Sequence, residues 1–135
     1  MYIALTNQKL MKNLITAFSF FLAFNFGSFA QTNGPKIEFE NSVVDYGEIP
    51  RGSDGIRVFN FVNTGNKPLE ITKVYSSCGC TIPKKPEAPI APGKTGKIQV
   101  KYDTNRLGPI RKTITVNSNS TETPIVSLKI KGVVH

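Results

Sequence analysis

The stretch Gly96-Lys97-Ile98-Gln99-Val100-Lys101-Tyr102 decides the fold class of this chain. Apolar and polar residues alternate along it, and successive side chains of a strand point to opposite faces of a sheet. The pattern therefore predicts a strand that buries Ile98, Val100 and Tyr102 and turns its lysines to water. A sheet with one buried and one wet face is the usual condition of antiparallel structure.

Similar short runs surround this strand, separated by Gly, Pro and Asn. We expect strands within residues 37–46, 56–62, 69–75, 96–102, 110–116 and 125–134. Ile114 and Val116, and likewise Val126, Leu128 and Ile130, should face inward. A Pro- and Lys-rich crossover is expected over residues 83–92, and no window after residue 30 shows a helical apolar stripe. Together these features predict an all-β, immunoglobulin-like antiparallel sandwich of about seven strands in two sheets.

The first thirty residues have the features of a secretory signal peptide. Lys9 and Lys12 precede the apolar run from Leu14 to Phe26, and small residues stand at Ser28 and Ala30. The run is too short to span a bilayer, and Met11 is an alternative start. We therefore divide the chain into a signal peptide (1–30), a flexible segment (31–36) and one sandwich domain (37–135), and expect a periplasmic or secreted protein.

The net charge suggests a class of partner without identifying one. Two of the seventeen basic residues lie in the predicted leader, which leaves fifteen against nine acidic residues and a charge of +6. Lys97 and Lys101 share one strand face, as do Lys129 and Lys131. If the two strands are neighbours, these four lysines form an anion-binding face for a glycan or lipid headgroup. The alternative is a charged surface that blocks association between sheet edges. An exported chain is not expected to bind nucleic acid.

Cys78-Gly79-Cys80 holds the only two cysteines of the chain. In an extended strand their Cα atoms would be about 6.6 Å apart, at the upper limit of the roughly 4.4–6.8 Å that a disulfide tolerates, and Gly79 permits the bend that brings them closer. Three interpretations remain open: a disulfide, a pair of thiolates for a soft metal, and two small packing groups. A complete metal site is not evident, because the single histidine is His135.

Other residues give no sign of catalysis. One histidine cannot readily support a Ser-His-Asp or Cys-His arrangement, and the nine carboxylates are scattered along different predicted elements. No phosphate-binding glycine loop or dinucleotide fingerprint is present. We therefore expect no enzymatic activity and no cofactor.

Three residues at turns are interpreted as determinants of the fold. Asn63 can hydrogen-bond turn backbone, and Gly65 can adopt the positive φ that a tight hairpin needs. Gly93 follows Pro92, which is typical of a type II turn.

Several landmarks along the chain occur in a fixed order. They are Phe59-x-Phe61-x-Asn63-Thr64-Gly65-Asn66, Pro68-Leu69-x-Ile71, Ser77-Cys78-Gly79-Cys80-Thr81, Ile90-Ala91-Pro92-Gly93, Gly108, Ser118-Asn119 and Ile130-Lys131-Gly132. This order resembles a bacterial exported family, the domain of unknown function 1573, over residues 37–133. The resemblance implies an immunoglobulin-like sandwich, related to Hydin-like and major-sperm-protein-like domains, and implies no established activity.

The sequence supports two hypotheses about function. The first is a non-catalytic exported interaction module that binds another envelope protein or an anionic glycan or lipid. The second is a thiol redox or soft-metal-handling protein that uses Cys78 and Cys80.

Overall fold

A computed structural model of the chain describes residues 33–135, and the predicted leader lies outside them. Within the described part all regular structure is β-strand, as expected. None of its segments forms a helix with the length and hydropathy needed to cross a membrane.

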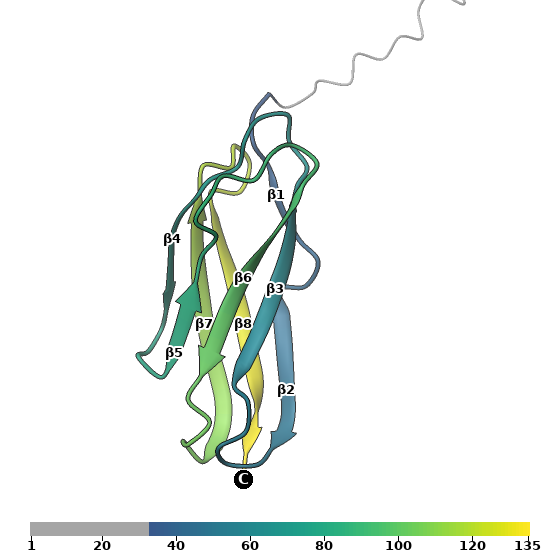
Figure 1. Ribbon diagram of the computed structural model, residues 1–135. Coiled ribbons are helices and arrows are strands. Elements are labelled where there is room, and N and C mark those ends of the chain that lie inside the picture. The colour runs from purple at the N-terminus through teal and green to yellow at the C-terminus, as the bar shows by residue number, and fades with distance from the viewer. Residues whose placement is uncertain (1–32) are drawn as a thin grey trace, which may run out of the picture. The chain divides into compact units, whose positions relative to one another are not determined.

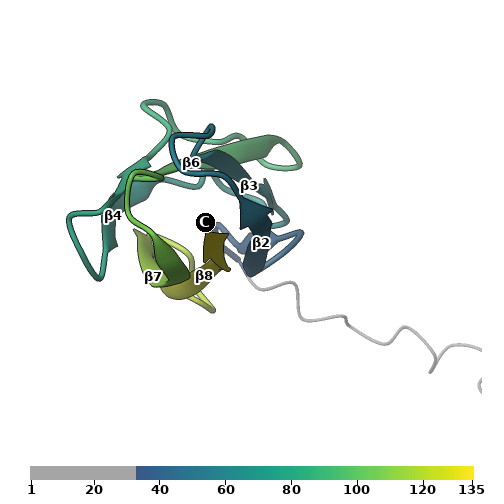
Figure 2. The ribbon, with the colours of Figure 1, turned by 90° about the horizontal axis from the view of Figure 1, so that it is seen from below.

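Eight strands form two sheets of four strands each (Figure 1). The strands are β1 (Ile37–Phe39), β2 (Val43–Ile49), β3 (Ile56–Asn63), β4 (Ile71–Ser76), β5 (Thr81–Lys84), β6 (Thr95–Tyr102), β7 (Gly108–Ser118) and β8 (Ile125–Val134). The first sheet has the order β1-β3-β6-β5, and the second has the order β2-β8-β7-β4. Viewed along the strands, the two sheets enclose the core from opposite sides (Figure 2). The predicted β-sandwich is confirmed.

The start of the sandwich differs from the expectation. Residues 37–46 do not form one strand, because the chain leaves the first sheet after Phe39 and joins the second sheet at Val43. There β2 runs parallel to β8, so the second sheet is mixed rather than antiparallel. This switch of sheets adds one strand to the six expected ranges, and β5, which overlaps only the start of the predicted crossover, adds another, so the sandwich has eight strands where about seven were expected.

The core lies between the two inner faces. The strand that decided the fold class buries Ile98, Val100 and Tyr102, as predicted, and leaves Lys97 and Lys101 exposed. The predicted inward residues of β7 and β8 also face the core, with Val126 partly buried at its margin. Full burial of such a side chain stabilises the fold by about 1.5–3 kcal/mol.

Tyr46 connects the two sheets at one end of the sandwich. It lies on β2 in the second sheet, and its hydroxyl donates a hydrogen bond of 2.7 Å to the carbonyl of Gly55, just before β3 in the first sheet. The guanidinium of Arg57 lies 4.3 Å from the centre of its ring. Burial raises the pKa of Tyr46 to about 12, because the phenolate would lose its hydration there.

Candidate functional site

Cys78 and Cys80 lie in the turn that carries the chain from β4 in the second sheet to β5 in the first. Their Cα atoms are 5.4 Å apart, and the two residues form a disulfide. Of the three interpretations open at the sequence level, the structure thus contains the disulfide. Backbone hydrogen bonds hold both ends of this cysteine turn: Ser77 N–H donates to Thr113 (3.0 Å) and Asp103 N–H donates to Cys80 (2.9 Å).

The two sulfur-bearing residues differ in their access to solvent. Cys80 is 7% exposed and belongs to the core cluster, whereas Cys78 is half-buried at its margin. Gly79 between them is exposed, with open space where a side chain would be. A thiolate approaching from solvent therefore has freer access to Cys78 than to Cys80.

Asn63 is a buried amide that joins three other segments of the chain. Its side-chain NH₂ donates to the carbonyl of Lys67 (2.7 Å) and to that of Ile90 (2.9 Å). Its oxygen accepts from the N–H of Gly65 (3.0 Å) and from that of Lys36 (3.3 Å). The residue is 0% exposed, so these four bonds replace the water that the amide loses on folding.

Gly65 and Gly93 need glycine for different reasons. Gly93 has φ = 75° in a turn closed by a 3.0 Å bond from Lys94 N–H to the carbonyl of Ala91, as expected for the type II turn. Gly65 does not have the positive φ that we predicted. Its requirement is steric, because an added Cβ would lie against the carbonyl oxygen of Gly34 and 2.6 Å from the nitrogen of Lys36.

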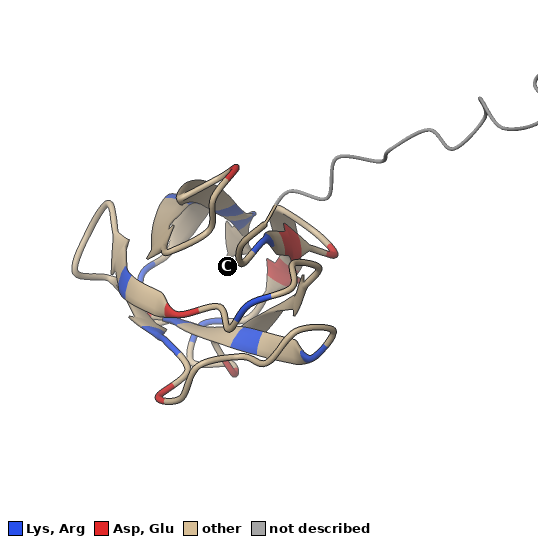
Figure 3. Ribbon diagram, turned by 90° about the horizontal axis from the view of Figure 1, so that it is seen from above, with Lys and Arg blue, Asp and Glu red and all other residues tan. Residues whose placement is uncertain are grey.

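The four lysines of the predicted anion-binding face do not lie on one face. Lys97 and Lys101 are on β6 in the first sheet, and Lys129 and Lys131 are on β8 in the second. The strands are not neighbours, which was the condition for a single face. Basic residues are instead distributed around both sheets (Figure 3).

On the second sheet, Lys131 lies directly opposite Arg111 of β7. A shallow groove of about 380 Å³ is lined by both residues together with Lys129 and Val43. Lys131 also forms an exposed ion pair with Asp45, with 3.7 Å between nitrogen and oxygen. The groove is therefore partly neutralised on one side.

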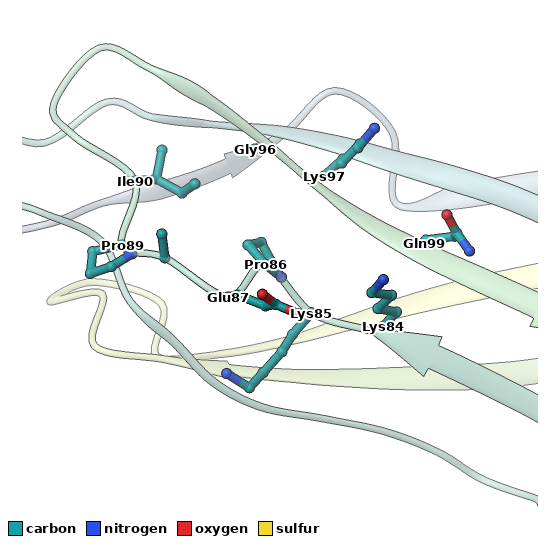
Figure 4. A pocket seen from close by; sticks show the side chains of 10 residues that line it. Lys84, Lys85, Pro86, Glu87, Pro89, Ile90, Gly96, Lys97 and Gln99 are labelled. Atoms are coloured by element: carbon teal, nitrogen blue, oxygen red, sulfur yellow. The ribbon is translucent and has the colours of Figure 1, made fainter.

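A larger groove, of about 630 Å³, lies along the first sheet. One wall is β6 at Gly96, Lys97 and Gln99, and the other is the crossover from Lys84 to Ile90. In Figure 4, Lys84, Lys97 and Gln99 project to the same side, whereas Lys85 points away from β6. We call this feature the β6 groove. Our sequence reasoning missed it, although the run Lys84-Lys85-Pro86 was a signal that the chain leaves the sheet there with a charged segment.

The far wall of the β6 groove is fixed by hydrogen bonds. Ile90 exchanges two backbone hydrogen bonds of 2.8 Å with Leu69, and its carbonyl also accepts from Asn63. Gly96 leaves room for this wall, because a Cβ there would lie against the ring of Phe61 and 3.0 Å from the side chain of Ile90. The groove is thus built into the fold.

The described residues offer no cluster for a metal ion, since no three His, Cys, Asp or Glu side chains gather among residues 33–135. Within this part of the chain the strongly raised pKa is that of Tyr46, which is far in sequence from both the cysteine turn and the β6 groove. The β6 groove presents lysine amines, the carboxylate of Glu87, the amide of Gln99 and proline rings, which can contact a ligand through charge, hydrogen bonds and apolar surface.

Comparison with known proteins supports the family and the fold. A family described as "Protein of unknown function (DUF1573)" matches residues 37–134. No match was found among curated proteins.

Similar solved structures include a protein of unknown function from Porphyromonas gingivalis, at a TM-score of 0.67 and 18% identity, over 81% of this chain and 51% of that one. The VesB protease of Vibrio cholerae is similar at a TM-score of 0.61 and 13% identity, over 73% of this chain and 32% of that one. The seventh PapD-like domain of human CEP192 is similar at a TM-score of 0.57 and 11% identity, over 74% of this chain and 85% of that one. The chain spans about half of the Porphyromonas structure, and at these identities the likeness shows the fold alone.

Proposed function

The chain belongs to the DUF1573 family, and we propose that it is an exported, non-catalytic interaction module of the bacterial envelope that binds another protein at the β6 groove. The export part of the proposal is supported by the predicted leader, which a folded cytoplasmic domain would not need. The binding part is supported by the β6 groove.

The single observation that carries the proposal is that the β6 groove, with a volume of about 630 Å³, is lined by three lysines and one glutamate. Lys84, Lys85 and Lys97 outnumber Glu87, and none of the four takes part in the ion pairs formed among residues 33–135. The volume lies within the range of about 300–1,000 Å³ that is usual for ligand sites. Unpaired charge around a groove with a fixed wall favours association with an acidic partner.

Site-specific photocross-linking in living cells tests this proposal. A benzoylphenylalanine residue is placed at position 97 in the β6 groove or, as a matched control, at position 129 on the other sheet. Both positions are exposed lysines in the middle of a strand, so both variants should fold. We expect a discrete cross-linked protein species from position 97 and none of the same mass from position 129.

Two outcomes would count against the proposal. The first is the absence of any cross-linked protein at position 97 across the growth conditions in which the chain is made. The second is an identical ladder of products from positions 97 and 129, which would indicate contact without a specific surface.

A second candidate function is favoured by the oxidised cysteine turn. A thiolate of a partner dithiol attacks the sulfur of Cys78, which forms a mixed disulfide and releases the Cys80 thiolate. The second partner thiolate then attacks the partner's own sulfur, which releases the Cys78 thiolate and leaves the partner oxidised. The chain gains two electrons and two protons, and the partner loses them.

Intact mass with alkylation before and after reduction distinguishes the two candidates. In a redox protein the disulfide would equilibrate with dithiol buffers near the potential of its compartment, and replacing both cysteines with serine would abolish its function. In a binding module the same replacement would leave the cross-link at position 97 unchanged.

A further inference from the structure

The two long sides of β6 differ in how far they are paired. On one side, β3 pairs with β6 over the whole length from Lys101 to Thr95. On the other side, β5 pairs only from Tyr102 to Gln99, where β5 ends at Lys84. Between Thr95 and Ile98 that edge of β6 therefore faces no strand, and the β6 groove lies there.

The alternation of an antiparallel ladder shows which backbone groups face the groove. Asp103 donates its N–H to the carbonyl of Cys80 on the β5 side. Every second residue of β6 directs its N–H and C=O to the same side, so Lys101 and Gln99 face β5. By the same alternation, Lys97 and Thr95 direct their backbone groups to this side of β6, and Lys97 lines the β6 groove there.

The outer edge of β5, by contrast, is unsuitable for a further strand. The alternation turns the backbone groups of Thr81 and Pro83 away from β6. Pro83 has no N–H to offer, and the N–H of Thr81 donates to the carbonyl of Cys78 at 3.4 Å. Proline at an edge is one of the means by which proteins prevent strand addition. The outer edge of β5 is therefore closed to strand addition. The edge of β6 from Thr95 to Ile98 stays unpaired beside the β6 groove.

The charges around the open edge favour an acidic occupant. Lys97 projects from the open stretch of β6, and Lys84 projects to the same side from the end of β5 (Figure 4). A strand placed beside Thr95–Ile98 would continue the line of β5 and bring its outward side chains next to these two amines. Inward side chains of the same strand would turn towards Ile90 and Pro86.

We propose that the β6 groove binds an extended acidic peptide segment of a partner protein, which pairs as an added strand with the open edge of β6 at Thr95–Ile98. The backbone of Lys97 supplies hydrogen bonds, and the amines of Lys84 and Lys97 select carboxylates at alternate positions of the peptide. This inference rests on the proposed function, because it specifies how a protein partner would be held. An anionic glycan offers the charge but not the alternating N–H and C=O groups, so it satisfies only half of the site.

The test uses protein exported to the periplasm of a bacterial host and a capped eight-residue peptide of alternating valine and glutamate. The comparison peptides are the same sequence with N-methylated central amides and a version with lysine in place of glutamate. Binding is followed by amide chemical shifts, and hydrogen exchange is measured at Lys97. We expect saturable binding of the acidic peptide, with exchange of the Lys97 amide slowed at least tenfold. Binding of both comparison peptides should be at least tenfold weaker.

Matched variants locate the site. Lys84→Glu/Lys97→Glu should weaken binding of the acidic peptide at least tenfold, and Lys129→Glu/Lys131→Glu should leave it unchanged. All four side chains are exposed, and circular dichroism verifies that both variants fold. Equal affinity for the N-methylated peptide would overturn strand addition. Equal affinity for a galacturonate hexamer, with no protection of the Lys97 amide, would show a plain anion site instead.

The two proposals can fail separately. A cross-linked protein at position 97 together with no slowing of exchange by the acidic peptide would leave the interaction module standing and overturn the added strand. Protection of Lys97 by the peptide without any cross-linked protein in cells would support the strand site and contradict the proposed cellular function.

Discussion

The turn at Asn63 and the cysteine turn both stand out in the sequence, yet the first links segments that are distant along the chain and the second links close neighbours. Asn63 makes four side-chain hydrogen bonds, two of which reach Lys36 and Ile90, each 27 residues away. The disulfide is a covalent bond, but it joins residues only two apart. A link stabilises a fold to the extent that it holds together segments that the unfolded chain lets drift apart.

The two turns also differ in what surrounds them. Asn63 is fully buried, whereas the cysteine turn has one half-buried cysteine and an exposed glycine. Buried polar networks are costly to disturb, and reactive groups need access. The β6 groove depends on both turns, since Asn63 holds its far wall through Ile90 and Cys80 precedes β5. We therefore expect the stability of the fold to depend on Asn63. Thiol–disulfide exchange would take place at Cys78.

Replacement of Asn63 should have the largest effect on stability. Asn63→Ala leaves the carbonyl of Lys67 and the N–H groups of Lys36 and Gly65 without this partner, whereas the carbonyl of Ile90 keeps its bond from Leu69. Because each buried orphan costs about 1–3 kcal/mol, the free energy of unfolding should fall by about 3 kcal/mol or more. Urea denaturation measures the loss. Asn60→Ala on the same strand is the control, since Asn60 is exposed and its side-chain NH₂ donates a 3.4 Å hydrogen bond to the exposed Glu40. A loss below about 1 kcal/mol for Asn63→Ala would break the comparison.

Gly65→Ala should cause the next largest loss of stability, and this loss should exceed that caused by Gly93→Ala. The Cβ at position 65 would collide with the backbone of the segment before β1, which cannot move without opening the bonds of Asn63. We expect a loss of about 2–3 kcal/mol, in the range of overpacked cores. At position 93 there is open space, so the cost is the left-handed conformation alone, about 1–2 kcal/mol. The reverse order in thermal or urea unfolding would show that the loop at Gly65 adapts more readily than its contacts indicate.

Removal of the disulfide should lower the stability of the fold by a smaller amount still. For a loop this short, Cys78→Ser/Cys80→Ser should lower the free energy of unfolding by at most about 2 kcal/mol, because the unfolded chain gains little freedom. Unfolding of the wild type with and without reductant gives an independent value. A loss as large as that of Asn63→Ala would mean that the cysteine turn holds β5 in place and is a structural clamp.

The sequence predicted the features that local alternation determines and missed those that depend on the arrangement of strands. Ile98 and Leu128 were placed in the core correctly, because the two-residue period is a property of a strand alone. The split between Phe39 and Val43 was not predicted, because both halves alternate acceptably and only the sandwich requires the chain to change sheets. The four lysines were expected to form one face only if their strands were neighbours. The strands lie in different sheets, and no local pattern shows this.

For the candidate site, the sequence likewise indicated which residues are important but did not show the reason for their importance. Gly65 was recognised as an obligatory glycine, but its requirement comes from the approach of Gly34, which is distant in sequence. The β6 groove arises because β5 stops at Lys84 while β6 continues, and the length of a paired strand cannot be read from either strand by itself.

Tyr46 provides the smallest and most specific test of the comparison, because it links the two sheets by a single hydrogen bond between residues nine apart. Tyr46→Phe should lower the free energy of unfolding at neutral pH by about 1 kcal/mol. The wild type should also lose stability as the pH rises from 10 to 12, because the unfolded chain ionises this phenol near its ordinary pKa of 10 while the folded chain keeps it protonated up to about 12. Below pH 10 this contribution is fully present. Denaturation of both proteins from pH 9 to 12 measures the difference, which should shrink as the pH rises. A difference that stays constant with pH would mean that Tyr46 stabilises the fold through packing alone. The hydrogen bond from Tyr46 to Gly55 would then contribute nothing, and side-chain hydrogen bonds between distant segments would not be the general source of stability that the comparison with Asn63 assumes.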